Sequence, residues 1–291
     1  MKTIRIGSRD SKLAIIQSEM VINAIKRFDS SIRTELVTMK TTGDKILDIS
    51  LDKIGGKGLF VKELDDALLC GAVDITVHSF KDMPMEINPD LPIAALSERE
   101  DARDVLILPN GSCDNSKPIG CSSKRRTIQL RELGFDLISP LRGNVITRMR
   151  KLDDQEYQGI ILAAAGIKRL GLEDRISRYF TTEEIMPSAC QGIIAVQARK
   201  DEKTEYLAAF HSPESQVIAD AERAFVTTLN GGCSSPIAAY AKYEGKLIVL
   251  CGMYVNEESN RIYKGSLRGK PSEAKWLGIE LANKIKMEAM G

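Results

Sequence analysis

The chain contains the stretch Asp74-Ile75-Thr76-Val77-His78-Ser79-Phe80-Lys81-Asp82-Met83-Pro84, in which a short strand pattern ends in a polar turn. Pro84 keeps a helix from absorbing these polar residues, because the residue before a proline avoids the helical conformation. Ligands of α/β proteins bind beyond the carboxyl ends of strands. The stretch therefore predicts an α/β fold with Lys81 and Asp82 at the rim of a ligand site. An adjacent Lys-Asp pair is also a common surface detail, so the motif needs support from its neighbours.

The sequence on either side of this stretch alternates strand and helix patterns, which is typical of α/β domains with mostly parallel sheets. The strand patterns cover residues 3–6, 34–39, 74–77, 104–108, 136–138 and 159–162. The helix patterns cover residues 13–28, 61–70 and 125–133 and a segment from Asn144. Ser8 and Ser11 are both available to cap the first helix.

The last quarter of the chain has a different pattern. A long helical stretch, residues 215–229, stops at Asn230-Gly231-Gly232, and strand patterns follow at 237–243, 246–255 and 261–267. A final helix begins near Pro271. Consecutive strands joined by short turns predict an antiparallel sheet with helices on one face, an α+β domain.

Length and composition limit the classes of protein to which the chain can belong. The 291 residues suit two or three domains, and 43% hydrophobic and 28% charged residues are typical of a soluble globular protein. We find no apolar run long enough to span a bilayer and no signal-peptide core, so we expect a cytoplasmic protein without a membrane partner. The six cysteines form no CxxC pair and there are two histidines, which argues against a metal site and a disulfide scaffold.

Six arginines fall between positions 125 and 150, although the formal net charge of the whole chain is only +1. A local positive cluster on a balanced chain indicates a dedicated anion site. Arginine also binds carboxylate or phosphate with a rigid two-pronged fork. A solvated helix face is the commoner explanation for any single member of the set, which comprises Arg125, Arg126, Arg131, Arg142, Arg148 and Arg150.

Three further segments have candidate functions, and each also has a plain structural explanation. The turn at residues 7–11 puts backbone N–H groups at a helix N-terminus, where Arg9 and Ser11 add donors for an anion, or it is a simple capped turn. The glycine-rich segment 51–60 is either a mobile lid or a surface loop. Cys233, after two glycines and before Ser-Ser-Pro, is either a reactive loop thiol or an incidental one.

Taken together, these motifs resemble the porphobilinogen deaminase family, also called hydroxymethylbilane synthases. The resemblance covers nearly the whole chain in the expected order, and the ordered set is specific where single motifs are weak. The matching segments are residues 5–9 (Arg-Ile-Gly-Ser-Arg), 55–64, 77–84, 122–126 (Ser-Ser-Lys-Arg-Arg), 141–145 (Leu-Arg-Gly-Asn-Val), 162–167, 221–225 and 231–233 (Gly-Gly-Cys).

The resemblance implies three domains: two α/β lobes like those of type II periplasmic binding proteins, and a C-terminal α+β domain with an antiparallel sheet. We assign residues 1–97 with 193–213 to the first lobe, 98–192 to the second and 214–291 to the third domain. It also implies that the enzyme condenses four porphobilinogen molecules head to tail onto a dipyrromethane cofactor, with loss of ammonia each time. Water then releases linear hydroxymethylbilane.

The resemblance also implies roles for individual residues. Asp82 matches the catalytic aspartate, and Cys233 matches the cysteine that holds dipyrromethane through a thioether. The positions expected to bind the carboxylates of cofactor and substrate are Arg9, Ser11, Ser79, Lys81, Ser123, Arg125, Arg126, Arg142 and Arg148. Lesser candidates for contacts in the cleft or its loops are Gln17, Lys53, Phe60 and Gln191. No metal is implied, and the family favours a monomer.

The sequence departs from the common family pattern at two positions. Cys190-Gln191-Gly192 stands where Gly-Gln-Gly is usual, so the hinge between the lobes is expected to be stiffer or differently shaped. Lys124 stands where an apolar residue is frequent, which adds charge to the arginine cluster.

Two other classes of protein fit the sequence less well. A binding protein without catalysis would need neither Cys233 nor Asp82. A nucleic-acid binder would be basic overall and rich in aromatic residues for stacking, whereas the net charge is +1 and aromatic residues make up 5%. We therefore expect porphobilinogen as the partner and no nucleic acid.

Overall fold

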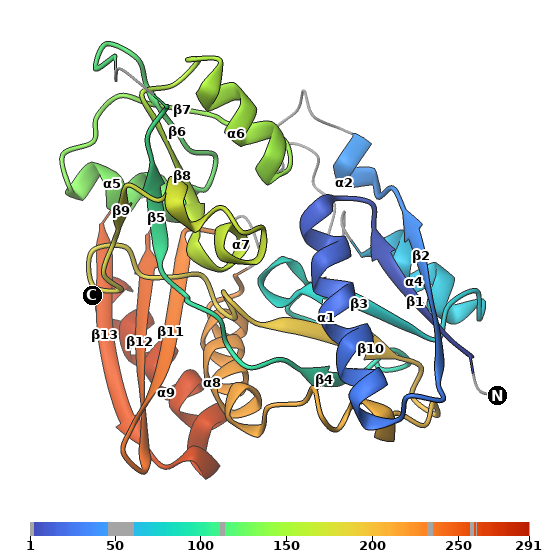
Figure 1. Ribbon diagram of the computed structural model, residues 1–291. Coiled ribbons are helices and arrows are strands. Elements are labelled where there is room, and N and C mark those ends of the chain that lie inside the picture. Colours follow the sequence, from blue (N-terminus) through green and yellow to red (C-terminus); the bar gives the residue numbers. More distant parts are fainter. Residues whose placement is uncertain are drawn as a thin grey trace.

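The computed structural model describes residues 3–45, 61–110, 114–231, 235–256, 259 and 261–290. Two five-stranded sheets, each with its own helices, form two α/β lobes, and a three-stranded antiparallel sheet with two helices forms a third unit (Figure 1). The predicted fold class, two α/β lobes and a C-terminal α+β domain, is therefore confirmed.

The first lobe has the strand order β2-β1-β3-β10-β4. Its strands are β1 (Thr3–Arg9), β2 (Arg33–Met39), β3 (Ile75–Ser79), β4 (Ile93–Leu96) and β10 (Ile194–Ala198). Its helices are α1 (Lys12–Phe28), α2 (Thr42–Lys45), α4 (Lys62–Leu69) and the short 3-10 helices η1 (Phe80–Asp82) and η3 (Glu205–Leu207). Of the two serines available as caps, Ser11 is the one that caps α1, where its side chain accepts the Ala14 N–H at 3.3 Å.

The second lobe repeats this arrangement with the strand order β7-β6-β8-β5-β9. Its strands are β5 (Asp104–Ile107), β6 (Ile119–Gly120), β7 (Ile138–Ser139), β8 (Gly159–Ala163) and β9 (Arg178–Tyr179). Its helices are α5 (Lys124–Glu132), α6 (Val145–Asp153), α7 (Ala164–Arg169) and the 3-10 helix η2 (Glu173–Arg175). Asn144 caps α6 by accepting the Thr147 N–H at 2.9 Å, which agrees with the predicted start of that helix.

Both large sheets are mixed, whereas the sequence predicted mostly parallel ones. In the first lobe β1 runs parallel to β2 and β3, but β10 is antiparallel to both β3 and β4. In the second lobe β5 is likewise antiparallel to β8 and β9. The reason is the route of the chain, because β10 and β5 each enter their sheet from the other lobe. The two crossover segments, residues 97–103 and 180–193, therefore connect the lobes.

The pairing of β10 in the first sheet fits the assignment of residues 193–213 to the first lobe. The domain boundaries themselves stay predictions. The third unit consists of α8 (Pro213–Thr228), β11 (Ile237–Glu244), β12 (Leu247–Val255), β13 (Ile262–Gly269), the 3-10 helix η4 (Pro271–Glu273) and α9 (Ala274–Met290). Gly278 lets the two long helices approach closely, because a Cβ there would lie 2.3 Å from the Ala221 carbonyl oxygen.

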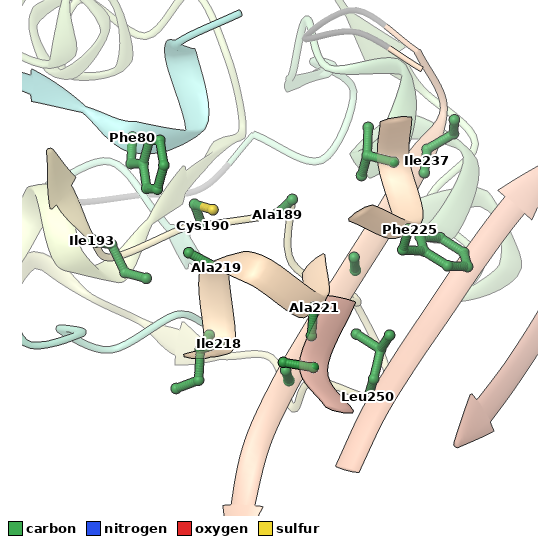
Figure 2. Packing of buried hydrophobic residues seen from close by; sticks show 14 of the residues in the cluster. Phe80, Ala189, Cys190, Ile193, Ile218, Ala219, Ala221, Phe225, Ile237 and Leu250 are labelled. Carbon is green, nitrogen blue, oxygen red and sulfur yellow. The ribbon is translucent and has the colours of Figure 1, made fainter. Parts of the chain in front are cut away.

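The largest hydrophobic core among the described residues joins the first lobe, the second crossover and the third unit. Phe80 from the first lobe, Cys190 and Ile193 from the second crossover, and Phe225 and Leu250 from the third unit belong to one cluster (Figure 2). The other face of the three-stranded sheet packs on the second lobe, where Ile128 of α5 contacts the cluster of Met186 and Met253. The third unit thus packs against both lobes and against the second crossover.

Candidate active site

A cleft of about 1370 Å³ lies between the lobes and is bordered by the third unit. The loop after β1, the η1 turn, the N-terminal ends of α5 and α6, and the second crossover all line it. The basic residues along its wall are Arg9, Lys40, Lys81, Lys124, Arg125, Arg126, Arg131, Arg142, Arg148 and Arg169. The acidic residues that line it, within the part of the chain that the structure describes, are Asp10 and Asp82. The cleft is therefore built to hold an anion with several charged groups.

Asp82 ends the η1 turn directly after β3, as the opening stretch of the sequence predicts. Its side chain is exposed in the cleft, while Phe80 and Met83 on either side are buried in the core. The buried neighbours hold the turn, so the carboxylate is presented on a fixed support. The charge of Asp82 raises the pKa of Lys81, Arg126 and Arg148, so it lies within the field of three cations.

Lys81 points to the crossover rather than to solvent. Its Nζ donates to Gln191 Oε1 at 3.2 Å. Burial lowers the pKa of Lys81 to about 8; Asp82 acts in the opposite direction and Arg126 adds to the lowering. The ammonium group is thus poorly hydrated, which favours its binding to a carboxylate.

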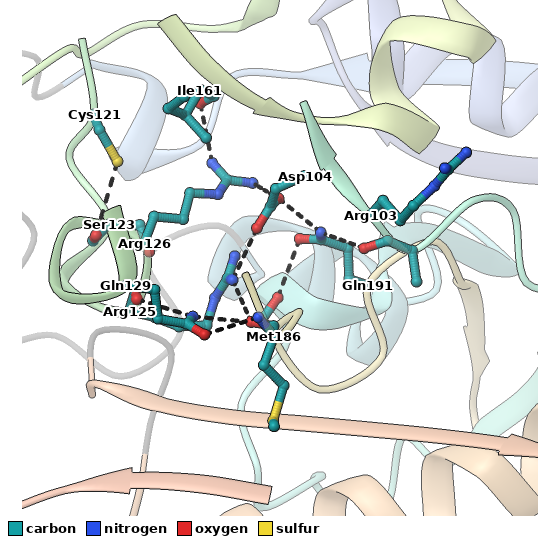
Figure 3. A network of polar contacts seen from close by, with 12 residues as sticks. Arg103, Asp104, Cys121, Ser123, Arg125, Arg126, Gln129, Ile161, Met186 and Gln191 are labelled. Carbon is teal, nitrogen blue, oxygen red and sulfur yellow. Dashed lines mark hydrogen bonds and ion pairs between the residues drawn. The ribbon is translucent and has the colours of Figure 1, made fainter. Parts of the chain in front are cut away.

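Arg125 and Arg126 are buried, with 4% and 7% exposure, and both pair with the fully buried Asp104 of β5. Arg125 Nη1 lies 2.8 Å from Asp104 Oδ2, and Arg126 Nη2 lies 2.6 Å from Oδ1 (Figure 3). Gln191 Nε2 also donates to Asp104 Oδ1, at 2.8 Å. Burial by itself raises the pKa of Asp104, but the two arginines outweigh it and hold that pKa well below its usual range.

The sequence analysis missed Asp104. It begins a predicted strand, and no pattern distinguishes it from the many exposed aspartates of the chain. Asp104 comes next to α5 only in the folded sheet, where β5 and β6 both pair with β8 and α5 follows β6. One carboxylate between two arginines leaves a net positive charge at this point of the cleft, so the pair retains attraction for an anion.

The turn at residues 7–11 and helix α1 supply the opposite wall. Arg9, Ser11, Gln17 and Ser79 all line the cleft, and Gln17 Nε2 donates to Ser79 Oγ at 2.9 Å. Because Ser11 caps α1 through its oxygen, its hydroxyl proton stays available to a ligand. These residues, predicted from motifs far apart in the sequence, are brought together by β1 and β3, which pair in one sheet.

Ser123, Arg142 and Arg148 complete the wall formed by the second lobe. Arg148 Nε donates to the Gly143 carbonyl at 2.7 Å, which orients its guanidinium. Burial lowers the pKa of Arg148 to about 10, and the neighbouring Arg126 and Arg142 add to this lowering. Cations crowded in this way repel one another, so an anionic ligand between them relieves the repulsion.

Not every predicted residue is among the described residues that line the cleft. Arg150 is exposed and does not line the cleft. Cys233, Lys53 and Phe60 fall outside the residues that the structure describes, although Ser235 and Ile237, just after Cys233, border the cleft. Arg169 of α7 was missed by the sequence analysis; it lines the cleft and its Nη2 donates to the Gly192 carbonyl at 2.6 Å.

Comparison with known proteins agrees with this arrangement. Residues 4–206 match the family model described as porphobilinogen deaminase, dipyromethane cofactor binding domain, and residues 216–287 match that of the porphobilinogen deaminase C-terminal domain. The porphobilinogen deaminase of Ruminiclostridium josui is 59% identical over 98% of both chains. That of Acetivibrio thermocellus is 59% identical over 96% of both chains.

The chain belongs to the porphobilinogen deaminase family. Its first two lobes are the dipyrromethane-binding part of a porphobilinogen deaminase, a transferase of tetrapyrrole biosynthesis.

Two departures from the family pattern have visible consequences in this porphobilinogen deaminase. Cys190 has a φ of 62°, the left-handed region that glycine adopts most easily, which explains why glycine is usual there. Its thiol is buried, and burial raises its pKa to about 12. Lys124 is exposed at the start of α5 and lines the cleft, so it adds to the positive charge there.

Among the described residues, no three His, Cys, Asp or Glu side chains are grouped so that they could hold a metal ion. Within the same ranges, no helix has the length and apolar character needed to cross a membrane.

Proposed function

We propose that this porphobilinogen deaminase polymerises porphobilinogen in the cleft between the lobes, with Asp82 as its catalytic residue. Four porphobilinogen molecules are joined head to tail onto a covalently bound dipyrromethane, each addition releases ammonia, and water releases linear hydroxymethylbilane. The observation that supports this site is the exposed carboxylate of Asp82 in a cleft whose charged wall residues, within the described part of the chain, are all cations except Asp82 and Asp10.

The cations suit the substrate because each pyrrole ring carries an acetate and a propionate. A chain of linked pyrroles therefore presents many carboxylates along its length. Arg9 of the first lobe and Arg142 and Arg148 of the second lobe line opposite sides of the cleft, and Lys81 lines it next to Gln191. Guanidinium groups bind carboxylates with two parallel hydrogen bonds, so they orient the substrate as well as hold it. Ser11, Ser79 and Ser123 add hydroxyl donors.

Asp82 suits the chemistry because the loss of ammonia leaves a cationic, azafulvene-like pyrrole. A carboxylate about 3 Å away stabilises such a cation as the positive charge develops. The same carboxylate accepts hydrogen bonds from pyrrole N–H groups and exchanges protons with the reacting unit. Asp82 in turn acts electrostatically on Lys81 and Arg126, whose pKa values its charge raises, so the carboxylate and these cations lie close together in the cleft.

The residues at hand fit the dipyrromethane cofactor, which Cys233 is proposed to hold through a thioether. The fit rests on the donor set, because the cleft wall provides arginine, lysine and serine groups for the cofactor's carboxylates. Ser235 and Ile237 follow Cys233 closely in sequence and border the same cleft. When bound, dipyrromethane supplies the pyrrole carbon to which the first unit is joined. Gln191, Gln17, Lys53 and Phe60 are proposed as further contacts.

We also propose the compartment, the oligomeric state and the partners of the enzyme. We expect a cytoplasmic monomer that acts on a small substrate and binds neither nucleic acid nor a membrane. The near-zero net charge supports this, because a polyanion-binding protein of this size would carry an excess of basic residues.

The decisive experiment is an intact mass of the purified protein under denaturing conditions. We expect an excess over the 32.1 kDa chain equal to two linked pyrrole units, and its loss in Cys233→Ser. Incubation with porphobilinogen should then add further pyrrole masses to the wild-type protein and release ammonia. Full activity in Cys233→Ser would contradict the assignment of the anchor. A wild-type protein that binds porphobilinogen without releasing ammonia would instead be a binding protein.

A further inference from the structure

Two adjacent residues of α8, Glu222 and Arg223, contact two different parts of the cleft wall. Glu222 is fully buried, although glutamate is among the residues least often found in a protein interior. Neither residue lines the cleft, so neither touches the ligand site directly. Glu222 contacts both crossover segments, and Arg223 contacts the turn that carries Asp82.

Glu222 ties both crossover segments to the third unit. Its Oε2 accepts the Arg99 guanidinium and the Cys190 backbone N–H, each at 2.6 Å. Its Oε1 accepts the Ala241 N–H at 2.6 Å. Arg99 lies in the first crossover and Cys190 in the second, so a single carboxylate binds both crossover segments. A buried carboxylate with three partners is a strong constraint, because removing the charge leaves those donors without acceptors.

Cys190 is followed by Gln191, which lines the cleft, so the contact of Glu222 with Cys190 also affects a cleft residue. Cys190 adopts a left-handed conformation that costs a non-glycine residue roughly 1 kcal/mol, and the hydrogen bond from its N–H to Glu222 holds it there. The next residue, Gln191, joins the two lobes. Its Oε1 accepts Lys81 Nζ from the first lobe, and its Nε2 donates to Asp104 Oδ1 of the second lobe. The backbone geometry at Cys190 therefore decides where the Gln191 amide points.

Arg223 holds the turn on which Asp82 stands. Its Nη2 donates to the carbonyls of Pro84 at 2.5 Å and Met85 at 2.8 Å. Its guanidinium also lies over the Phe80 ring, 4.6 Å from the centroid. These contacts fall on both sides of Asp82 in the sequence, so they restrain the turn before and after the carboxylate.

We propose that Glu222 and Arg223 are positioning residues for the condensation reaction: Glu222 orients Lys81 through Cys190 and Gln191, and Arg223 orients Asp82 through the turn at residues 80–85. Both residues belong to one turn of α8. The same helix therefore fixes the conformation of the second crossover and the position of the Asp82 carboxylate. The inference rests on the proposed function of Asp82 and Lys81.

The test compares Arg223→Lys and Glu222→Gln with the wild-type holoenzyme. Arg223→Lys keeps the charge but loses the fork that reaches two carbonyls, and Glu222→Gln keeps the shape but loses the charge. We expect kcat for porphobilinogen to fall about tenfold or more in both variants, with the cofactor retained by intact mass. KM should stay within about twofold in Arg223→Lys, which acts on Asp82, and should rise in Glu222→Gln, because Lys81 also binds the substrate carboxylates. A misplaced carboxylate weakens the transition state more than it weakens substrate binding.

Two controls separate positioning from plain loss of stability. Glu214→Gln changes an exposed glutamate at the start of the same helix and should leave kcat unchanged. Ile285→Val removes a buried methylene of the α9 core. It should lower the melting temperature, while kcat measured below that temperature stays at the wild-type value. If Arg223→Lys and Glu222→Gln behave like Ile285→Val, the positioning role is wrong.

A double variant tests the route through Gln191. If Glu222 acts through Gln191, the double variant Glu222→Gln/Gln191→Ala is no slower than the slower single variant, whereas additive losses would contradict that route. Should Glu222→Gln not fold, Arg99→Gln/Glu222→Gln removes both charges and should still be slow, and a normal kcat there would overturn the proposal. Wild-type protein that releases no ammonia would instead refute the proposed function.

Discussion

The protonation state of Lys81 should make substrate binding in the cleft depend on pH. Its pKa is lowered to about 8 by burial, and the charged groups that face it are Asp82, Arg126, Asp104 and Arg125. Because only the ammonium form attracts a carboxylate, substrate binding should weaken as pH rises through that value. This loss is not unfolding: the pKa lies below the ordinary 10.5, so the unfolded chain binds more protons between these values and stability from this group rises with pH.

We therefore expect the pH profile of kcat/KM to fall above about pH 8, with a midpoint set by Lys81. Lys81→Arg, whose guanidinium stays charged, should retain activity to higher pH. The measurement is kcat/KM from pH 6 to 10 for both proteins, with melting temperatures at each pH. Superimposable basic limbs in the two proteins would show that another group controls the decline.

Asp82 is the residue on which the proposed chemistry depends most. Asp82→Asn keeps the size of the side chain but removes the charge that stabilises the cationic pyrrole. We expect kcat to fall roughly 100-fold or more, on the order of 3 kcal/mol of transition-state stabilisation. Because Asp82 is exposed, the melting temperature should change little and the cofactor mass should remain. A near-normal rate of ammonia release would show that the carboxylate is not needed.

At Gly192, the second crossover passes very close to the backbone of the first crossover. Gly192 has a φ of 92°, and a Cβ there would lie 2.2 Å from the Glu100 carbonyl oxygen, which is backbone of the first crossover. Gly171 has a φ of 66°, but none of the residues that the structure describes lies within 4 Å of its Cβ position. The two glycines therefore separate the cost of backbone strain from the cost of a collision between the crossovers.

Gly192→Ala should destabilise the protein by roughly 3 kcal/mol or more, and Gly171→Ala by about 1 kcal/mol. Urea denaturation of both variants measures the difference. Equal losses in the two variants would mean that the crossovers separate at little cost.

The whole molecule presents a cationic cleft on a chain of nearly zero net charge. The attraction between this cleft and a substrate with two carboxylates is screened by salt. We expect kcat/KM for porphobilinogen to fall roughly fivefold between about 0.05 and 0.5 M salt. An absence of salt dependence would contradict carboxylate binding by the cleft.

Two arginines give a matched comparison for this effect. Arg142 lines the cleft and Arg150, in the following helix α6, is exposed outside it. Arg142→Leu should raise KM roughly tenfold and reduce the salt dependence, and it should block elongation as seen in the masses of intermediates. Arg150→Leu should change neither quantity.

The sequence alone determined the alternation of elements, the motifs and the family, because these depend on local periodicity and on ordered short patterns. Asn144 as the start of α6 and Asp82 in the turn after β3 are local signals of this kind, and the structure agrees with both. The mixed sheets were not predicted, because the antiparallel direction of β10 and β5 depends on chain crossings between lobes.

The tertiary structure alone decided which charged groups meet in the interior. Asp104 pairs with Arg125 and Arg126, and Glu222 pairs with Arg99, across separations of 21, 22 and 123 positions in the chain. No sequence pattern marks Asp104, and the matching family segment that contains Glu222 does not indicate its burial, because the burial of both acids follows from the packing of elements that are distant in sequence. Local chemistry thus identifies the residues that face a ligand, and long-range packing determines the buried ion pairs that hold them in place.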